Sequence, residues 1–117
     1  MSILKIKNFA IGNKEPMTLM AGVNVLESES VVMAVAEKFA STTSSLNINW
    51  IFKGSFDKAN RSSISSFRGP GLDEGLKMLE KVKSEFDAPV ITDIHEPSQA
   101  DPVSEICDVI QIPAFLC

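Results

Sequence analysis

The chain alternates short apolar runs with longer stretches in which apolar residues recur every three or four positions. The short runs are typical of buried strands, and the spaced stretches are typical of helices with one buried face. Strands are predicted at Met17–Gly22, Trp50–Lys53, Pro89–Thr92 and Val109–Ile112, and helices at 29–41, 72–86 and 97–106. Strands that alternate with helices in this order predict an α/β fold with a parallel sheet and right-handed crossovers.

Two segments modify this pattern. The run Ser41–Ser45 consists of Ser and Thr residues, whose side chains compete for backbone hydrogen bonds, so we expect the first helix to end near residue 41. Before Met17, apolar residues alternate with polar ones, which predicts a β-hairpin with its turn near Lys7 and Asn8.

The number of strands is half of what a closed barrel needs. A (β/α)₈ barrel takes about 250 residues, and four predicted strands in 117 residues make almost half of one. The last strand has no helix after it, so a small open sheet would expose an edge and a face. We therefore expect residues 1–117 to be the N-terminal portion of a single (β/α)₈ barrel domain, truncated after the fourth strand.

Composition excludes several classes of protein. With 44% hydrophobic and 22% charged residues the chain is an ordinary globular sequence, and a net charge of −4 argues against a nucleic-acid or anionic-membrane binder. Its apolar runs fall far short of the roughly 20 residues that cross a bilayer. Two cysteines and no signal segment predict a cytosolic protein without disulfides.

The candidate chemistry lies where the strands end, since parallel-sheet proteins bind ligands beyond the carboxyl ends of their strands. The segment 54–71 has no helix or strand period and predicts a long loop, which in a compact domain is usually functional. Four cations lie in or beside it against the single acid Asp57, namely Lys53, Lys58, Arg61 and Arg68. Such a loop suits phosphate or carboxylate, although a solvated loop with scattered charges has the same composition.

At this point the residues match a known family. Residues 52–63 read FKGSFDKANRSS, and shorter matching strings follow or precede them at 24–28 (NVLES), 67–71 (FRGPG), 92–96 (TDIHE) and 111–116 (QIPAFL). From about Pro16 to the end, the chain resembles the 3-deoxy-D-manno-octulosonate 8-phosphate synthases, and the long lysine-containing string is the most specific match.

The resemblance implies a cytosolic, homotetrameric (β/α)₈ enzyme of lipopolysaccharide core biosynthesis that condenses phosphoenolpyruvate with arabinose 5-phosphate and releases phosphate. The resemblance assigns the catalytic candidates Lys58, Asn24 and Asp93. It assigns phosphoenolpyruvate binding to Lys53, Ser55, Lys58, Gln111 and Ala114, and sugar-phosphate binding to Asn60, Arg61, Ser62, Asp93, Pro113 and Phe115. Arg61 and Ser62 resemble residues that reach the sugar phosphate of a neighbouring subunit.

The residue at position 24 indicates whether the enzyme needs a metal ion. Metal-dependent members of the family place a metal-binding cysteine at this position, whereas asparagine marks the metal-independent class. An amide is a far poorer ligand than a thiolate for a borderline transition metal. The resemblance therefore implies no metal and no other cofactor.

Other interpretations stay open at the level of sequence. The chain has a single histidine, His95, which is either a hydrogen-bonded structural residue or part of the site. The alternatives to the leading function are a phosphoenolpyruvate-condensing synthase that acts on another sugar phosphate, and a phosphate-binding module without catalysis.

Overall fold

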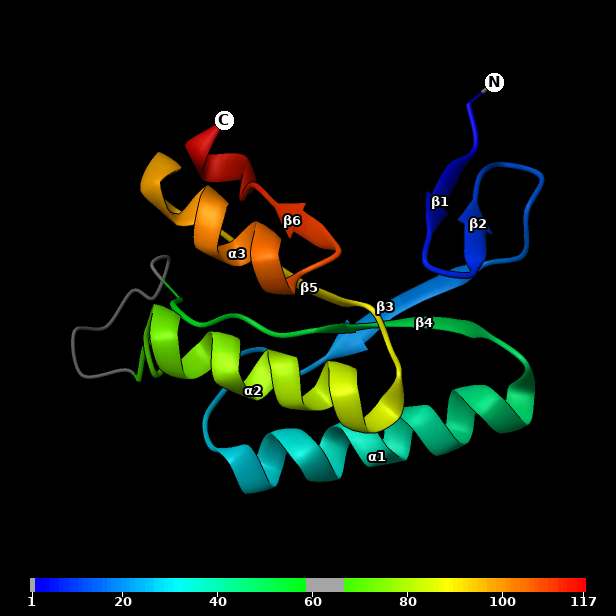
Figure 1. Cartoon of the computed structure of the whole chain (residues 1–117), viewed down its shortest axis with the longest axis horizontal. Helices are drawn as coiled ribbons and strands as arrows, with labels where there is room; N and C mark the ends of the chain where they lie inside the picture. The colour runs from blue at the N-terminus through cyan, green and yellow to red at the C-terminus, as the bar shows by residue number, and fades with distance from the viewer. Residues whose placement is uncertain (1, 59–66) are drawn as a thin grey trace.

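Four parallel strands form the central sheet of the chain. The computed structural model describes residues 2–58 and 67–117. The strands are β3 (Thr18–Gly22), β4 (Asn49–Lys53), β5 (Val90–Asp93) and β6 (Val109–Gln111), and they pair in that order. Helices α1 (Glu29–Leu46), α2 (Leu72–Phe86) and α3 (Ala100–Ile106) connect them (Figure 1). The predicted α/β fold with a parallel sheet is confirmed.

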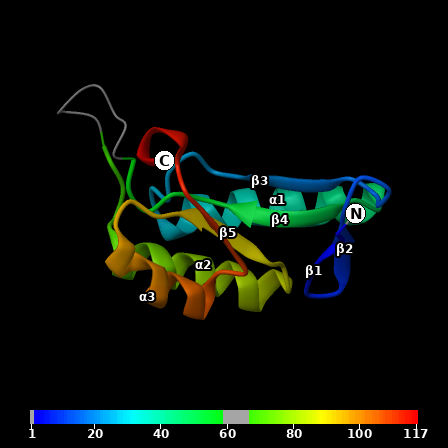
Figure 2. The ribbon, with the colours of Figure 1, turned by 90° about the horizontal axis from the view of Figure 1, so that it is seen from above.

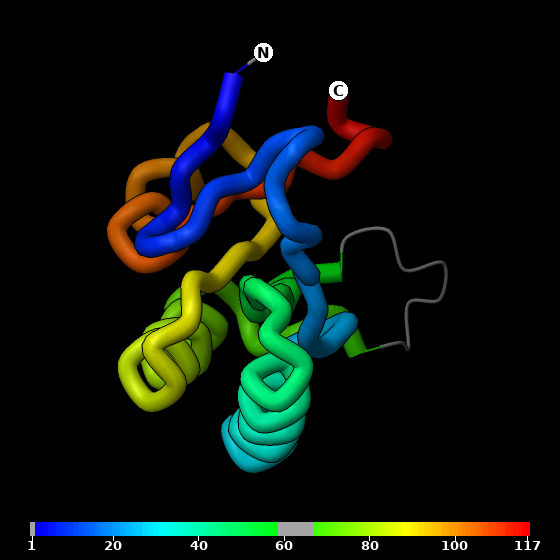
Figure 3. Tube along the Cα trace, turned by 90° about the vertical axis from the view of Figure 1, so that its right-hand side faces the viewer, coloured from blue at the N-terminus to red at the C-terminus, as the bar shows by residue number. Residues whose placement is uncertain are grey.

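Successive side chains along each strand point to opposite faces of the sheet. On one face, the side chains of Trp50, Phe52 and Val90 are buried in a core that includes residues of the three helices. On the other face, Ile51 and Ile91 belong to a second, smaller cluster. Figure 3 shows α1 and α2 on one side of the sheet and the N-terminal segment on the other.

The N-terminal segment is the predicted hairpin. Strands β1 (Leu4–Ile6) and β2 (Phe9–Ile11) pair antiparallel, and the turn between them contains Lys7, whose φ of 51° is left-handed. Ile6 is buried against Ile51 and Ile91. The hairpin therefore covers the second face near the end of the sheet where the strands begin (Figure 2).

An ion pair links the hairpin turn to the end of α2. Nζ of Lys7 lies 2.8 Å from Oδ1 of Asp87. This hydrogen bond and the positive charge of Lys7 lower the pKa of the Asp87 carboxyl. Because Asp87 is exposed, the pair helps to orient the hairpin but contributes little to the free energy of folding.

The prediction that the first helix ends near residue 41 is wrong, because α1 continues to Leu46. Its Ser and Thr side chains do not displace the backbone hydrogen bonds. The hydroxyl of Thr43 donates to the carbonyl of Phe39 one turn earlier, at 2.7 Å, and Thr43 is buried. The helix ends instead at Asn47, which adopts the left-handed conformation with φ 56°.

The later elements follow the predicted pattern with small shifts. Helix α2 begins at Leu72 and ends at Phe86 as expected, and β5 extends one residue further than predicted, to Asp93. The segment 97–106 divides into a 3₁₀ turn, η1 (Pro97–Gln99), and α3. None of the helices in the described ranges is long and apolar enough to cross a membrane.

The two cysteines occupy opposite environments, which leads to a labelling prediction. Burial raises the pKa of the Cys107 thiol to about 12, and the nearby carboxylate of Asp108 adds to the effect, whereas Cys117 is exposed. Because the thiolate is the reactive species, we expect a thiol reagent at pH 8 to modify Cys117 rapidly and Cys107 only after unfolding. Time-resolved labelling measured by mass spectrometry tests this, with Cys117→Ser as the control that removes the fast phase. Two equally fast thiols in the native protein would contradict the burial of Cys107.

Candidate functional site

The carboxyl ends of the four strands bring several predicted site residues to one edge of the sheet. Gly22 pairs with Lys53, and Asp93 pairs with Gln111, so each of these residues ends its strand at the same edge. Lys53 pairs with Ile91, two residues before Asp93, so the side chains of Lys53 and Asp93 share the face that the helices do not cover. Figure 2 shows the strand ends on the side of the molecule away from the hairpin.

A buried hydrogen bond joins the loop after β4 to the end of β5. The hydroxyl of Ser55 donates to Oδ1 of Asp93 at 2.5 Å, and both residues are buried, with 3% and 6% of their surface exposed. A hydroxyl that donates to a buried carboxylate forms a charge-assisted bond, which is shorter and stronger than a neutral one. This bond links two of the predicted site residues directly.

The second oxygen of Asp93 faces His95. Nε2 of His95 lies 3.4 Å from Oδ2 of Asp93, and each side chain is 9% exposed. The imidazole also meets the ring of Phe56 edge-on, with the ring centroids 6.0 Å apart. His95 is therefore not an isolated structural histidine, because it contacts a predicted site residue directly.

Backbone hydrogen bonds close the base of the loop that carries Lys58. The N–H of Lys58 donates to the carbonyl of Arg68 at 2.6 Å, and the N–H of Gly71 donates to the carbonyl of Phe56 at 3.1 Å. The two ends of the loop therefore lie side by side. Lys58, which is half-buried, is held at this base.

Glycines make the close approach of the loop ends possible. Gly69 has a φ of 134°, and a Cβ atom there would lie 2.2 Å from the carbonyl oxygen of Phe56. On α2, a Cβ atom on Gly75 would lie 2.5 Å from Cβ of Phe56. The carbonyl group and Cβ of buried Phe56 thus occupy space that a side chain at these two positions would need.

The charge of Arg68 is not available to a ligand in the way the sequence suggests. Its guanidinium binds both carboxylate oxygens of Asp57, at 2.9 and 3.0 Å. This bidentate pair braces the loop base. Among the described residues, the lysines assigned to phosphoenolpyruvate are Lys53, which ends β4, and Lys58, which lies in the loop.

The remaining predicted residues have different positions. Asn24 is exposed in the connection after β3, and Gln111 accepts a backbone hydrogen bond from Ile94 at 3.0 Å. Pro113 is buried, whereas Ala114 and Phe115 are exposed in the 3₁₀ turn η2 (Ala114–Leu116). Asn60, Arg61 and Ser62 lie outside the residues that the structure describes.

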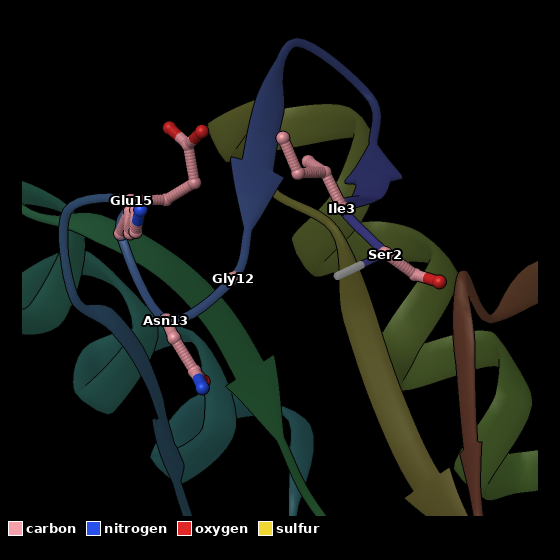
Figure 4. A pocket seen from close by; sticks show the side chains of 6 residues that line it. Ser2, Ile3, Gly12, Asn13 and Glu15 are labelled. Carbon is pink, nitrogen blue, oxygen red and sulfur yellow. The ribbon is translucent and has the colours of Figure 1, made fainter.

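A hollow beside the hairpin and the candidate site lie at opposite ends of the sheet. A hollow of about 330 Å³ opens beside the hairpin, lined by Ser2, Ile3, Gly12, Asn13, Lys14 and Glu15 (Figure 4). Residues 12–15 lead into the start of β3, so this hollow is far along the strands from Lys53 and Asp93. It does not belong to the candidate site.

The described residues contain no cluster of three or more His, Cys, Asp and Glu side chains that could hold a metal ion. His95 and Asp93 are two such side chains, and Cys107 lies in the core under the helices. Independence from metal stays a prediction from the resemblance.

Sequence reasoning missed the residues that support the site. Phe56 and Gln99 carry no charge that would single them out, yet one packs on His95 and the other binds its backbone N–H at 2.8 Å. Gly69 and Gly75 are visible in the sequence, but only the structure shows that both leave space for Phe56.

Comparisons with known proteins agree with the resemblance. The chain is 58% identical to a protein of Pseudoalteromonas translucida and 56% identical to proteins of Psychromonas ingrahamii and Stutzerimonas stutzeri, each named 2-dehydro-3-deoxyphosphooctonate aldolase. These matches cover 97% of the chain and 40 to 41% of the relatives, so the chain spans about two fifths of their length. The sequence profile described as the DAHP synthetase I family matches residues 2–117. The chain therefore belongs to the DAHP synthetase I family.

Proposed function

We propose that this chain provides part of the active site of a synthase that condenses phosphoenolpyruvate with D-arabinose 5-phosphate. The products are 3-deoxy-D-manno-octulosonate 8-phosphate and inorganic phosphate. The observation that carries the proposal is the name shared by relatives at 56 to 58% identity, which denotes a phosphorylated eight-carbon deoxy keto acid.

The carbon count and the charges of the substrates fit this reaction. Three carbons of phosphoenolpyruvate and five of the sugar make the eight-carbon product. Carbon 3 of the enol forms a bond to the sugar aldehyde carbon, the aldehyde oxygen takes a proton, and water adds at carbon 2 as phosphate leaves. Positive charge then develops at carbon 2 beside a carboxylate and a phosphate, where fixed donors stabilise it most.

Lysines and small donors at the strand ends suit phosphoenolpyruvate. Lys53 ends β4, Ser55 is buried beside it, and Lys58 lies at the closed base of the loop. We assign these three residues, with Gln111 and Ala114, to the phosphoenolpyruvate subsite. Two ammonium groups that hold both anionic ends of one substrate reduce the entropic cost of orienting it against the second substrate.

The sugar subsite is assigned to the neighbouring strand ends and to the loop. Asp93 is an acceptor that suits sugar hydroxyls, and Pro113 and Phe115 follow β6. Asn60, Arg61 and Ser62 complete the assignment from the resemblance. The bond from Ser55 to Asp93 supports this arrangement, because it ties a residue of one proposed subsite to a residue of the other.

The proposal also concerns the complete protein. Four parallel strands whose helices all cover the same face are compatible with the first half of a (β/α)₈ barrel. We propose that the complete protein is a cytosolic homotetrameric barrel of lipopolysaccharide core biosynthesis, in which Arg61 and Ser62 reach the sugar phosphate of a neighbouring subunit.

One alternative shares the same chemistry. The name of the matching family refers to a different synthase, and Lys53 and Lys58 would bind phosphoenolpyruvate equally well whichever sugar phosphate accepts it. Release of inorganic phosphate from phosphoenolpyruvate with arabinose 5-phosphate, compared with a four-carbon sugar phosphate, separates the two. The assay uses a protein that carries this chain at the full length of its relatives, which we call the full-length protein.

Lys58→Ala tests the assigned lysine. We expect kcat/KM in the full-length protein to fall by more than about 10²-fold, because an electrostatic donor to the developing charge is lost. Lys38→Ala is the matched control, since Lys38 is exposed on α1 and should leave kcat/KM within about twofold. Near-normal turnover of the Lys58 variant would refute its assignment.

Chelation tests the role of Asn24. Because an amide is a weak ligand for transition metals, we expect phosphate release by the full-length protein to survive dialysis against EDTA, without bound metal at stoichiometric level. Elemental analysis and the initial rate are measured on the same sample. Loss of activity that Zn²⁺ or Mn²⁺ restores would place the protein in the metal-dependent class.

A further inference from the structure

The two oxygens of the Asp93 carboxylate have different partners from different elements. Ser55, from the loop after β4, donates to Oδ1 at 2.5 Å, and His95, after β5, places Nε2 3.4 Å from Oδ2. A carboxylate that is held at one oxygen alone still rotates about its bond to Cβ. Contacts at both oxygens restrict that rotation.

The tautomer of His95 follows from this contact. A carboxylate oxygen only accepts hydrogen bonds, so a lone pair on Nε2 facing Oδ2 would be repelled. A proton on Nε2 makes the 3.4 Å approach to Oδ2 attractive. In the neutral imidazole, Nδ1 then carries the lone pair.

Packing against Phe56 orients the ring, and two hydrogen bonds to Gln99 hold the backbone that carries it. Its edge-on packing with Phe56 fixes the plane, with an interplanar angle of 90°. The amide oxygen of Gln99 accepts from the backbone N–H of His95 at 2.8 Å and of Glu96 at 3.2 Å, which holds the start of η1 against the end of β5. The imidazole therefore reaches Asp93 from a braced backbone.

Placing the His95 ring here costs folding stability. Nδ1 of His95 is buried and has no hydrogen-bond partner among residues 2–58 and 67–117. An unpaired buried nitrogen opposes folding, so a histidine that served packing alone would be replaced without loss by an apolar ring. The compensating contact is the one between Nε2 and Asp93.

We infer that His95 is a positioning residue, whose Nε2–H acts with the hydroxyl of Ser55 to hold the Asp93 carboxylate in the orientation that receives the sugar substrate. This inference rests on the proposed function for the identity of that substrate. His95 acts through Asp93 and needs no contact of its own with the reacting atoms.

The kinetic test compares two substitutions in the full-length protein. His95→Phe keeps an aromatic ring against Phe56 but removes the donor, and His95→Gln retains an N–H donor near the position of Nε2. For His95→Phe we expect a loss of roughly 10²-fold in kcat/KM for arabinose 5-phosphate, as misplacement of a binding group produces, with the KM for phosphoenolpyruvate unchanged within twofold. His95→Gln should recover most of the loss.

Ser98→Ala is the matched control, since Ser98 is exposed in η1 three residues from His95. It should change neither substrate's KM. Normal kinetics for arabinose 5-phosphate in His95→Phe, or an equal loss in His95→Phe and His95→Gln, would overturn the inference. So would equal effects on both substrates, which indicate a general structural role.

A spectroscopic test judges the contact independently of activity. Long-range ¹H–¹⁵N spectra of the full-length protein, labelled uniformly with ¹³C and ¹⁵N, should show a proton on Nε2 of His95, with the ring signals assigned through bonds from the backbone of His95 in the unaltered protein. A neutral ring with its proton on Nδ1 would overturn the inference even if both variants fail to fold. Failure of the unaltered protein to release phosphate overturns the proposed function instead, and the imidazole spectrum then still decides whether His95 holds Asp93.

Discussion

The hydrogen bond from Ser55 to Asp93 connects the two elements on which the candidate site depends. It joins the loop after β4 to the end of β5 at a position shielded from water, where losing the hydroxyl would leave the carboxylate short of a partner at a cost of about 1–3 kcal/mol. The parallel pairing of the strands makes this contact possible, because it brings successive carboxyl ends to one edge. Lys53 and Gln111 reach the same edge for the same reason.

Packing at the base of the loop holds its two described ends, 54–58 and 67–71, in place. Phe56 is buried between the loop ends and α2, and Gly69 and Gly75 provide the space it occupies. The pair of Asp57 and Arg68 closes the same base from the outside. Buried Phe56 and this ion pair thus hold the loop base at which Lys58 bonds to Arg68, and the charge of Arg68 braces the loop.

Regular elements were predictable where side-chain periodicity reflects burial. The spacing in 72–86 identifies α2 to its ends, and the alternation before Met17 identifies the hairpin. The end of α1 was not predictable from the run of Ser and Thr, since Thr43 can bond the carbonyl of Phe39 as easily as it can leave the helix. The candidate residues at the ends of strands, such as Lys53 and Asp93, followed from the rule that ligands bind at the carboxyl edge of parallel strands.

By itself the sequence determined the order of strands and helices, the family, and the types of residue that gather where the strands end. These properties depend on local periodicity and on short motifs, which are readable along one chain. Only the tertiary structure decided that Ser55 binds Asp93, that Arg68 is occupied by Asp57, and that His95 faces the remaining carboxylate oxygen. Each of these contacts joins residues through the register of strands and the packing of a loop, and the free energy of such contacts depends on distances that no local pattern encodes.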